Sequence, residues 1–227
     1  MEAAQQGDSL CTSCRKRIAH DPLALLAAVL DRASQQEREQ HAQLADYEIG
    51  RLLGAGGMGA VYFAWHKRTG DQAAVKVMLS KVRVSDRARQ QFLREIEITQ
   101  TLRHPHIVRF LGHGTEKNLF YFLLEYCAGG SVADLMKRCG GKLALEEAQP
   151  ILLHALHGLA YLHEQGFVHR DLKPHNLLLA GNAGAWTTKI SDLGLAKSFE
   201  QAGLSGMTAT GNVAGSFPFM PREQLIN

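Results

Sequence analysis

The sequence has few cysteines, no long apolar run and little net charge. Its 227 residues include four cysteines and six prolines, and the formal net charge at pH 7 is +3. So few cysteines argue against a disulfide-stapled secreted scaffold, and a reducing cytoplasm is the simplest setting for them. The longest apolar run, residues 22–30, is shorter than the ~20 residues that a membrane-spanning helix needs. We therefore expect a cytoplasmic protein with no membrane span and, given its small net charge, no nucleic-acid partner.

The first 45 residues differ in character from the rest. Residues 1–21 are polar and contain Cys11 and Cys14 in a Cys-x-x-Cys pair, which is half the ligand set of a zinc ribbon. Free thiols and a half-ribbon completed by another chain both stay open. Asp21 and Pro22 form a typical helix start, and leucines follow at helical spacing. We assign 1–45 to an N-terminal tail with a short helix and 46–227 to one globular domain.

The globular part begins with strands and continues with helices. Apolar and β-branched stretches predict strands at 47–53, 60–66, 72–79, 108–112, 120–126, 176–179 and 189–191. Helices are expected at 86–102 and 148–165, the second with Pro150 in its first turn and with Leu152, Leu156, Leu159 and Leu162 on its apolar side. A β-rich first half followed by a helical second half predicts an α+β protein of two lobes with a cleft between them.

The second half carries a polar octet, His169-Arg-Asp-Leu-Lys-Pro-His-Asn176, which is followed by Asp192-Leu-Gly194. Asp171 can orient a substrate hydroxyl and accept its proton, and Lys173 can neutralise charge on a moving phosphoryl group. Asn176 and Asp192 offer the hard oxygen ligands that Mg²⁺ prefers. These residue types at this spacing predict phosphoryl transfer.

A glycine-rich turn, Gly54-Ala-Gly56-Gly57-Met-Gly59-Ala-Val61, lies between the first two expected strands. A plain hairpin turn would also explain it, and dinucleotide-binding folds use the same glycine spacing, but between a strand and a helix. The strand-to-strand context favours a flap over ATP phosphates. Glycines suit that role because backbone N–H groups can approach phosphate oxygens without a Cβ clash.

Together these motifs resemble the protein kinase family over residues 47–227, and the lysine two positions after Asp171 resembles its serine/threonine branch. The chain is identified as a member of the eukaryotic-like serine/threonine protein kinases of bacterial type. The resemblance implies a bilobal protein-kinase-like fold, with an N-lobe at 46–126 and a partial C-lobe at 127–227. It also implies transfer of the ATP γ-phosphoryl group to Ser or Thr hydroxyls of protein substrates, with Mg²⁺ or Mn²⁺ as the metal. Because the family pattern continues with further helices after Glu223, we expect a C-terminally truncated chain.

The resemblance also implies roles for individual residues. Lys76 would contact the α- and β-phosphates, and Glu95 would pair with it, although a solvated surface side chain would explain either residue. The implied catalytic set is Asp171, Lys173, Lys76 and Glu95, and the implied metal ligands are Asn176 and Asp192. The implied nucleotide-binding set is Leu53, Gly54, Ala55, Gly56, Gly57, Met58, Gly59, Val61, Ala74, Lys76, Glu125, Cys127 and Leu178.

Three further assignments follow from the resemblance. Leu124 would close the back of the adenine pocket, and Glu125 and Cys127 would bind the adenine edge through their backbones. His169 would be structural, packing under the catalytic loop. Residues 195–219 resemble an activation loop, in which Thr208 and Thr210 are the preferred sites of self-phosphorylation.

Two alternatives stay open. The first is a catalytically inactive truncated kinase or pseudokinase that acts as a nucleotide-binding or regulatory module. The expected truncation favours it, and the intact set of Lys76, Glu95, Asp171, Asn176 and Asp192 opposes it. The second is a small-molecule phosphotransferase with a similar pair of lobes, against which the Lys-Pro step after Asp171 argues.

Overall fold

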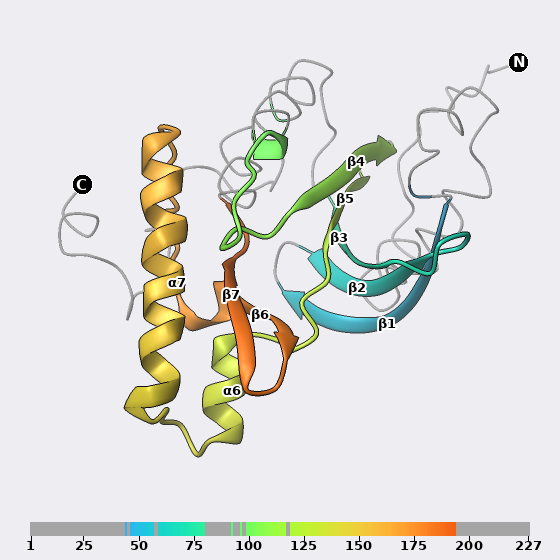
Figure 1. Cartoon of the computed structure of the whole chain (residues 1–227). Coiled ribbons are helices and arrows are strands. Elements are labelled where there is room, and N and C mark those ends of the chain that lie inside the picture. Colours follow the sequence, from blue (N-terminus) through green and yellow to red (C-terminus); the bar gives the residue numbers. More distant parts are fainter. Residues whose placement is uncertain are drawn as a thin grey trace, which may run out of the picture.

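The computed structural model describes residues 44, 46–56, 59–79, 92, 96, 99–116 and 119–193. Five antiparallel strands form one sheet, in the spatial order β1-β2-β3-β5-β4. They are β1 (Tyr47–Gly56), β2 (Gly59–His66), β3 (Gln72–Leu79), β4 (Phe110–Glu116) and β5 (Leu119–Glu125). The second lobe contains α6 (Val132–Arg138), α7 (Leu145–Glu164), the 3₁₀ turn η1 (Pro174–Asn176) and a hairpin of β6 (Leu177–Asn182) and β7 (Ala185–Ile190). Figure 1 shows the sheet on one side, α7 on the other and the hairpin in the middle.

The sheet is apolar on both faces because alternate residues of each strand enter different cores. One core cluster contains Leu44, Tyr62, Val75, Tyr121 and Leu123. The other contains Met78, Phe92, Ile96, Phe110, Phe120 and Phe122. Lys76 lies two residues before Met78 and opposite Phe122, so the strand places its amine on the second of these faces. The α+β architecture with a β-sheet lobe and a helical lobe is the predicted one.

The predicted strands are present, with ends that differ by a few residues. The expected helix at 86–102 is described only in part, and its residues Phe92, Ile96, Thr99 and Gln100 are helical.

The tail at 1–45 lies outside the described residues, apart from the fully buried Leu44. Of the helices that are described, none is both long and apolar enough to cross a membrane.

The helix α6 was missed by the sequence analysis. Its N-cap is Ser131, whose hydroxyl accepts the Asp134 N–H at 3.1 Å, while the Asp134 carboxylate accepts the Ser131 N–H at 2.9 Å. This reciprocal pair is a capping box, and the Ser-x-x-Asp spacing that encodes it is visible in the sequence. Apolar periodicity did not reveal the helix because it has only seven residues, of which Val132 alone is buried.

Two expectations for the long helix α7 are wrong. The helix begins at Leu145, so Pro150 lies in its second turn, where the missing N–H removes one hydrogen bond. Leu152 and Leu156 are each 59% exposed. Leu162 is buried and Leu159 packs against the core, as expected, but Ile151, Ala155 and Gly158 build the rest of the buried face. Small residues at positions 155 and 158 let this face approach the hairpin closely, and leucine spacing alone gave no sign of that.

The outer edge of β7 is bonded by a loop and a helix. A two-stranded ribbon is marginally stable by itself, and its unpaired backbone groups need partners. The Thr188 N–H donates to His154 Nδ1 at 3.3 Å, and the Thr188 carbonyl lies 3.1 Å from His106 Nδ1. Ile190 N–H donates to the His106 carbonyl, and Val108 N–H donates to the Ile190 carbonyl, both at 2.9 Å. The segment around His106 thus lies along β7, where Ile107 and Ile190 form an isolated parallel bridge.

Gly158 permits this arrangement by bringing α7 close to the segment around His106. A Cβ at position 158 would lie 2.8 Å from the His106 carbonyl oxygen and 2.9 Å from Ile190 Cδ1. Both distances are shorter than carbon contacts in folded proteins, so a methyl group there would push α7 away from β7.

We therefore expect Gly158→Ala to lower the free energy of unfolding by about 1–3 kcal/mol through overpacking. In an uncrowded helix the same change would stabilise the protein by about 0.5–1 kcal/mol. Urea denaturation measures the difference. Ala160→Gly, at an exposed position of the same helix, calibrates the helix-propensity effect. A stabilised Gly158→Ala protein would contradict the close packing described above.

Candidate active site

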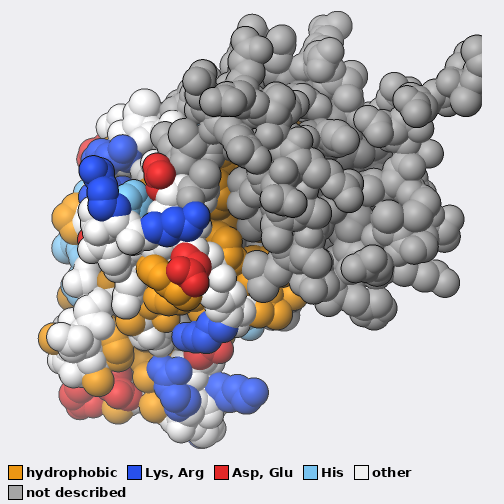
Figure 2. Space-filling view, turned by 90° about the vertical axis from the view of Figure 1, so that its right-hand side faces the viewer, with side chains coloured by type: hydrophobic (Ala, Val, Ile, Leu, Met, Phe, Trp, Pro, Cys, Tyr) orange, Lys and Arg blue, Asp and Glu red, His pale blue; other side chains and the backbone are white. Residues whose placement is uncertain are grey.

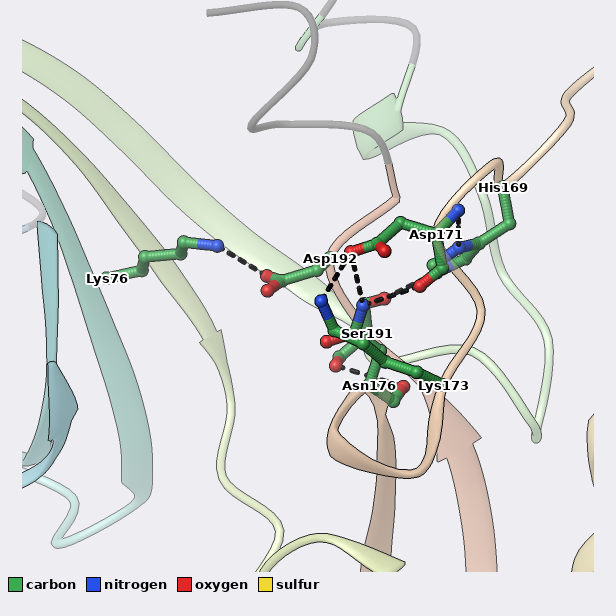
Figure 3. Close-up of polar contacts among 7 residues, drawn as sticks. All are labelled: Lys76, His169, Asp171, Lys173, Asn176, Ser191 and Asp192. Atoms are coloured by element: carbon green, nitrogen blue, oxygen red, sulfur yellow. Dashed lines mark hydrogen bonds and ion pairs between the residues drawn. The ribbon is translucent and has the colours of Figure 1, made fainter. Parts of the chain in front are cut away.

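The carboxylate of Asp171 is held by two neighbours in the loop that leads to β6. Lys173 Nζ lies 2.8 Å from Asp171 Oδ2, and Asn176 Nδ2 donates to the same oxygen at 3.2 Å and to the Asp171 carbonyl at 2.8 Å. Asn176 is fixed in turn by η1, since its N–H donates to the Lys173 carbonyl at 2.9 Å. The loop therefore presents one oriented carboxylate beside one amine (Figure 3).

His169 connects this loop to the end of β7. Its ring is buried, its Nδ1 accepts the Asp171 N–H at 3.3 Å, and its Nε2 lies 2.8 Å from the Ser191 carbonyl. The carbonyl can only accept, so the ring is neutral with its proton on Nε2. Burial lowers the pKa of His169 and keeps this form. Its position matches the structural role that the sequence predicts.

Asp192 is the second residue after the end of β7, and it lies beside Asn176. The Ser191 N–H and hydroxyl both donate to the Asn176 carbonyl, at 2.9 and 3.1 Å. Asp192 then adopts φ 57°, and Arg170 in the loop adopts φ 60°. The left-handed region is unfavourable for side chains other than Gly, Asn and Asp, and such positions are concentrated at functional sites.

Lys76 and Asp192 form an ion pair between the two lobes. Lys76 Nζ lies 2.6 Å from Asp192 Oδ1, and the side chains are 13% and 37% exposed. In Figure 3 the lysine extends from β3 on one side, the loop residues lie on the other, and Asp192 lies between them. Glu95, the expected partner of Lys76, lies outside the described residues, so that pairing stays a prediction.

Two of the residues predicted to surround adenine, Val61 and Ala74, share one face of the sheet. Val61 is opposite Lys76 across β2 and β3, and Ala74 is opposite Leu124 across β3 and β5. Leu178, the third, lies on β6 of the hairpin, where it forms an antiparallel bridge with Ser131. A small cavity borders Leu124 on one side and Asp192 on the other. Because Val61, Ala74 and Leu178 do not line this cavity, the position of Leu124 at the back of an adenine pocket stays a prediction.

The glycine turn lies between two strands, as predicted. β1 and β2 pair up to Gly56 and Gly59, and Leu53, Gly54 and Ala55 belong to β1. Gly59 has φ 153°, and a Cβ there would overlap the Val77 carbonyl oxygen of β3. Glycine is therefore required at position 59 by the sheet itself. Gly57 and Met58 lie outside the described residues.

The side chain of Glu125 has a structural role that the sequence analysis did not assign. Its carboxylate accepts the Arg109 N–H at 3.0 Å and lies 3.0 Å from Lys189 Nζ on β7. Glu125 N–H donates to the Arg109 carbonyl at 2.8 Å. The residue that ends β5 thus holds the segment before β4 and the hairpin of the other lobe. A lone glutamate at a strand end carries no sequence signal for these contacts.

The donor atoms near Asp192 suit a magnesium ion that is bound mainly by phosphates. Among the described residues no group of three or more His, Cys, Asp or Glu side chains is arranged to hold a metal. Mg²⁺ needs no such group, because it commonly takes one or two protein oxygens together with water and phosphate. Asn176 uses its NH₂ toward Asp171, which leaves its amide oxygen as the atom to face a cation beside Asp192.

The comparisons with known proteins agree with this geometry. The family model for the protein kinase domain matches residues 47–227. This chain belongs to the protein kinase family. It is 37% identical over 190 residues to CBL-interacting protein kinase 17 of Oryza sativa subsp. japonica, which covers 83% of this chain and 40% of the relative.

Two further relatives have similar identity. An Aurora kinase of Yarrowia lipolytica (strain CLIB 122 / E 150) is 38% identical over 151 residues, or 66% of this chain and 40% of the relative. The serine/threonine-protein kinase ATG1a of Arabidopsis thaliana is 37% identical over 155 residues, or 68% of this chain and 24% of the relative. The kinase chain thus spans 40% or less of the length of these relatives, which are plant and fungal proteins. They do not support the bacterial subtype that the sequence analysis expected.

Burial should make the two described cysteines react differently. Cys127 is 6% exposed, and burial raises the pKa of its thiol to about 12, whereas Cys139 is exposed. The thiolate is the reactive form. We expect iodoacetamide at about pH 8 to alkylate Cys139 and to spare Cys127, as measured by peptide mass spectrometry. Labelling of both in the unfolded protein is the control, and equal labelling in the folded protein would contradict the buried position of Cys127.

Proposed function

We propose that this kinase chain transfers the γ-phosphoryl group of ATP to a Ser or Thr hydroxyl of protein substrates. The observation that carries the proposal is the carboxylate of Asp171, which Lys173 and Asn176 orient in the same site as the ion pair of Lys76 and Asp192. Phosphoryl transfer depends mainly on positioning and on neutralising charge, and these five side chains supply both.

In the proposed reaction Asp171 accepts the proton of the substrate hydroxyl. The hydroxyl oxygen then bonds to the γ-phosphorus, and the bond from that phosphorus to the β,γ-bridging oxygen breaks, so that ADP leaves. Lys173, 2.8 Å from Asp171, would stabilise charge on the transferred group. Mg²⁺ or Mn²⁺, when bound at Asn176 and Asp192, would neutralise charge on the phosphates.

Nucleotide binding would require Lys76 to change partner. Its amine now neutralises the carboxylate of Asp192. A cation at that carboxylate would release the lysine toward the α- and β-phosphates, where the glycine turn supplies backbone N–H groups. Glu95 is proposed to hold the lysine in that position.

The adenine edge would bind the backbone after β5. The Glu125 N–H already donates to Arg109, and the Cys127 carbonyl already accepts the Gly130 N–H at 3.3 Å. The complementary groups, the Glu125 carbonyl and the Cys127 N–H, are the ones proposed to accept from and donate to adenine. Val61, Ala74 and Leu178 would pack against its faces.

The remaining parts of the proposal concern partners and location. Proteins carrying Ser or Thr are the proposed substrates, and the 195–219 loop of the chain itself, which lies outside the described residues, is one of them. On the face shown in Figure 2, Lys and Arg side chains alternate with Asp and Glu among the described residues, so that face offers nucleic acid no single-sign surface. A cytoplasmic location is proposed because the reaction consumes ATP.

Replacement of Asp171 tests the reaction. We expect Asp171→Asn to lower phosphate transfer from Mg-ATP to casein, a general protein substrate, by about 10²–10⁴-fold, since the carboxylate that accepts the proton is lost. Binding of Mg-ADP, measured by calorimetry, should change little. Asp71→Asn, at an exposed turn, is the matched control and should keep full transfer. Full transfer by Asp171→Asn would contradict the proposed role.

Replacement of Asp192 separates binding from transfer. Asp192→Asn should weaken Mg-ADP binding by tenfold or more, because the anionic metal ligand is lost, while binding of adenosine should be unchanged.

If the unmodified chain binds Mg-ADP but transfers no phosphate to casein or to itself, the function is the alternative one of a nucleotide-binding regulatory module. Phosphate found on a sugar and never on protein would favour a small-molecule phosphotransferase.

A further inference from the structure

Four histidines gather where the segment before β4, α7 and β7 meet. The rings of His106 and His154 are stacked with centroids 4.2 Å apart and an interplanar angle of 19°. His104 lies 5.4 Å from His106 on one side, and His157 lies 5.9 Å from it on the other. We call these four residues the histidine junction. It lies on the side of β7 away from β6, outside the phosphate-transfer site, and α7 runs beside that strand in Figure 1.

The hydrogen bonds of the junction fix which ring nitrogens carry protons. His154 Nδ1 accepts the Thr188 N–H at 3.3 Å, so this nitrogen must be unprotonated. His106 Nδ1 lies 3.1 Å from the Thr188 carbonyl, which can only accept, so this nitrogen is the donor. His104 Nδ1 accepts the His106 N–H at 3.2 Å. The junction is therefore built for neutral rings at His104 and His154.

Protonation would break these bonds. A proton on His154 Nδ1 would face the Thr188 N–H, and two donors cannot bond. The same conflict would arise between His104 and the His106 N–H.

The other ionisable groups around the junction give little compensation. Lys189 on β7 adds positive charge near His104, and Arg103 N–H donates to the Tyr161 hydroxyl next to the His104 ring. Glu164, at the end of α7, is the one acidic group among the described residues that acts on His104. Burial, followed by the neighbouring His106 and His157 rings, lowers the pKa of both His104 and His154. For His104 the neutral form is thus favoured by burial, His106, His157 and Lys189, and it is opposed by Glu164.

The junction is connected to the active site through β7. Thr188 is bonded to His106 and His154, Ile190 is bonded to the His106 backbone, and Asp192 follows two residues later. We propose that His106 and His154 are positioning residues for Asp192, and that protonation of the junction below neutral pH releases β7 and weakens metal–nucleotide binding. The binding consequence rests on the proposed function, whereas release of β7 does not.

The sign of the effect on stability follows from proton linkage. At a pH well above about 6.5, these histidines are neutral in both the folded and the unfolded chain. In that range the free energy of unfolding does not change with pH because of them. As the pH falls below that value, the unfolded chain binds protons that the folded junction resists, so the free energy of unfolding decreases. The loss continues until the pH reaches the lowered pKa values of His104 and His154.

His154→Asn provides the test, because the asparagine Oδ1 can accept the Thr188 N–H but does not titrate. His163→Asn, at an exposed position of the last turn of α7, removes a histidine of the same helix outside the junction. The full chain and both variants are compared at about pH 7.5 and about pH 5.5. Hydrogen exchange at the Thr188 amide reports release of β7, and calorimetry with Mg-ADP reports binding.

We expect the unmodified chain and His163→Asn to lose Thr188 protection at the lower pH, after correction for intrinsic exchange, whereas His154→Asn keeps it. The ratio of the Mg-ADP Kd of the unmodified chain to that of His154→Asn should rise by about threefold or more over this range, with tenfold per pH unit as the limit for one group. Titration of the nucleotide itself cancels in this ratio.

Equal acid sensitivity of Thr188 exchange in the unmodified chain and in His154→Asn overturns the proposal. So does unchanged protection of Thr188 in the unmodified chain at the lower pH, a result that does not depend on the variant folding. If the chain fails to bind Mg-ADP even at about pH 7.5, the proposed function fails, and the exchange measurement still decides the fate of the junction.

Discussion

The position of the active-site carboxylates depends on the outer edge of β7. This strand belongs to a two-stranded ribbon, and its exposed backbone groups must find partners. The segment around His106 and the imidazole of His154 supply them, and Gly158 lets α7 come close enough to complete the contact. With β7 fixed in this way, the chain emerges at Ser191, bonds to Asn176 and turns Asp192 toward Lys76.

Among the described residues, two ion pairs join the lobes, and they serve different purposes. Lys189 and Glu125 connect β7 to the end of β5 through their side chains. Lys76 and Asp192 connect β3 to the end of the hairpin, and they are the side chains proposed to bind phosphate and metal. The lobes are therefore joined by one contact that can persist and by another that, in the proposed function, a metal–nucleotide pair would replace.

Much of this arrangement could be read from the sequence because it rests on local patterns. Alternating apolar residues predicted the strands, and the octet at 169–176 brought Asp171, Lys173 and Asn176 together within one loop. The buried face of α7 could not be read, since it depends on Gly158 and Ala155 meeting a partner far along the chain. The pairing of Lys76 with Asp192 and the role of the Glu125 carboxylate are likewise contacts between distant segments, for which residue spacing holds no information. The short helix α6 was readable from its cap and was overlooked.

At position 192 stability and the proposed chemistry favour different residues, because the left-handed backbone suits glycine whereas metal binding needs the carboxylate. With φ 57°, this residue occupies a region that glycine enters without a Cβ clash, whereas aspartate is tolerated there less readily than glycine. A library of this protein sorted only for folding would therefore drift toward glycine at 192, and the proposed metal-binding carboxylate would disappear from the survivors. Thermal ranking is thus a misleading guide at this residue, and stabilised versions of the protein must be sought with position 192 held constant.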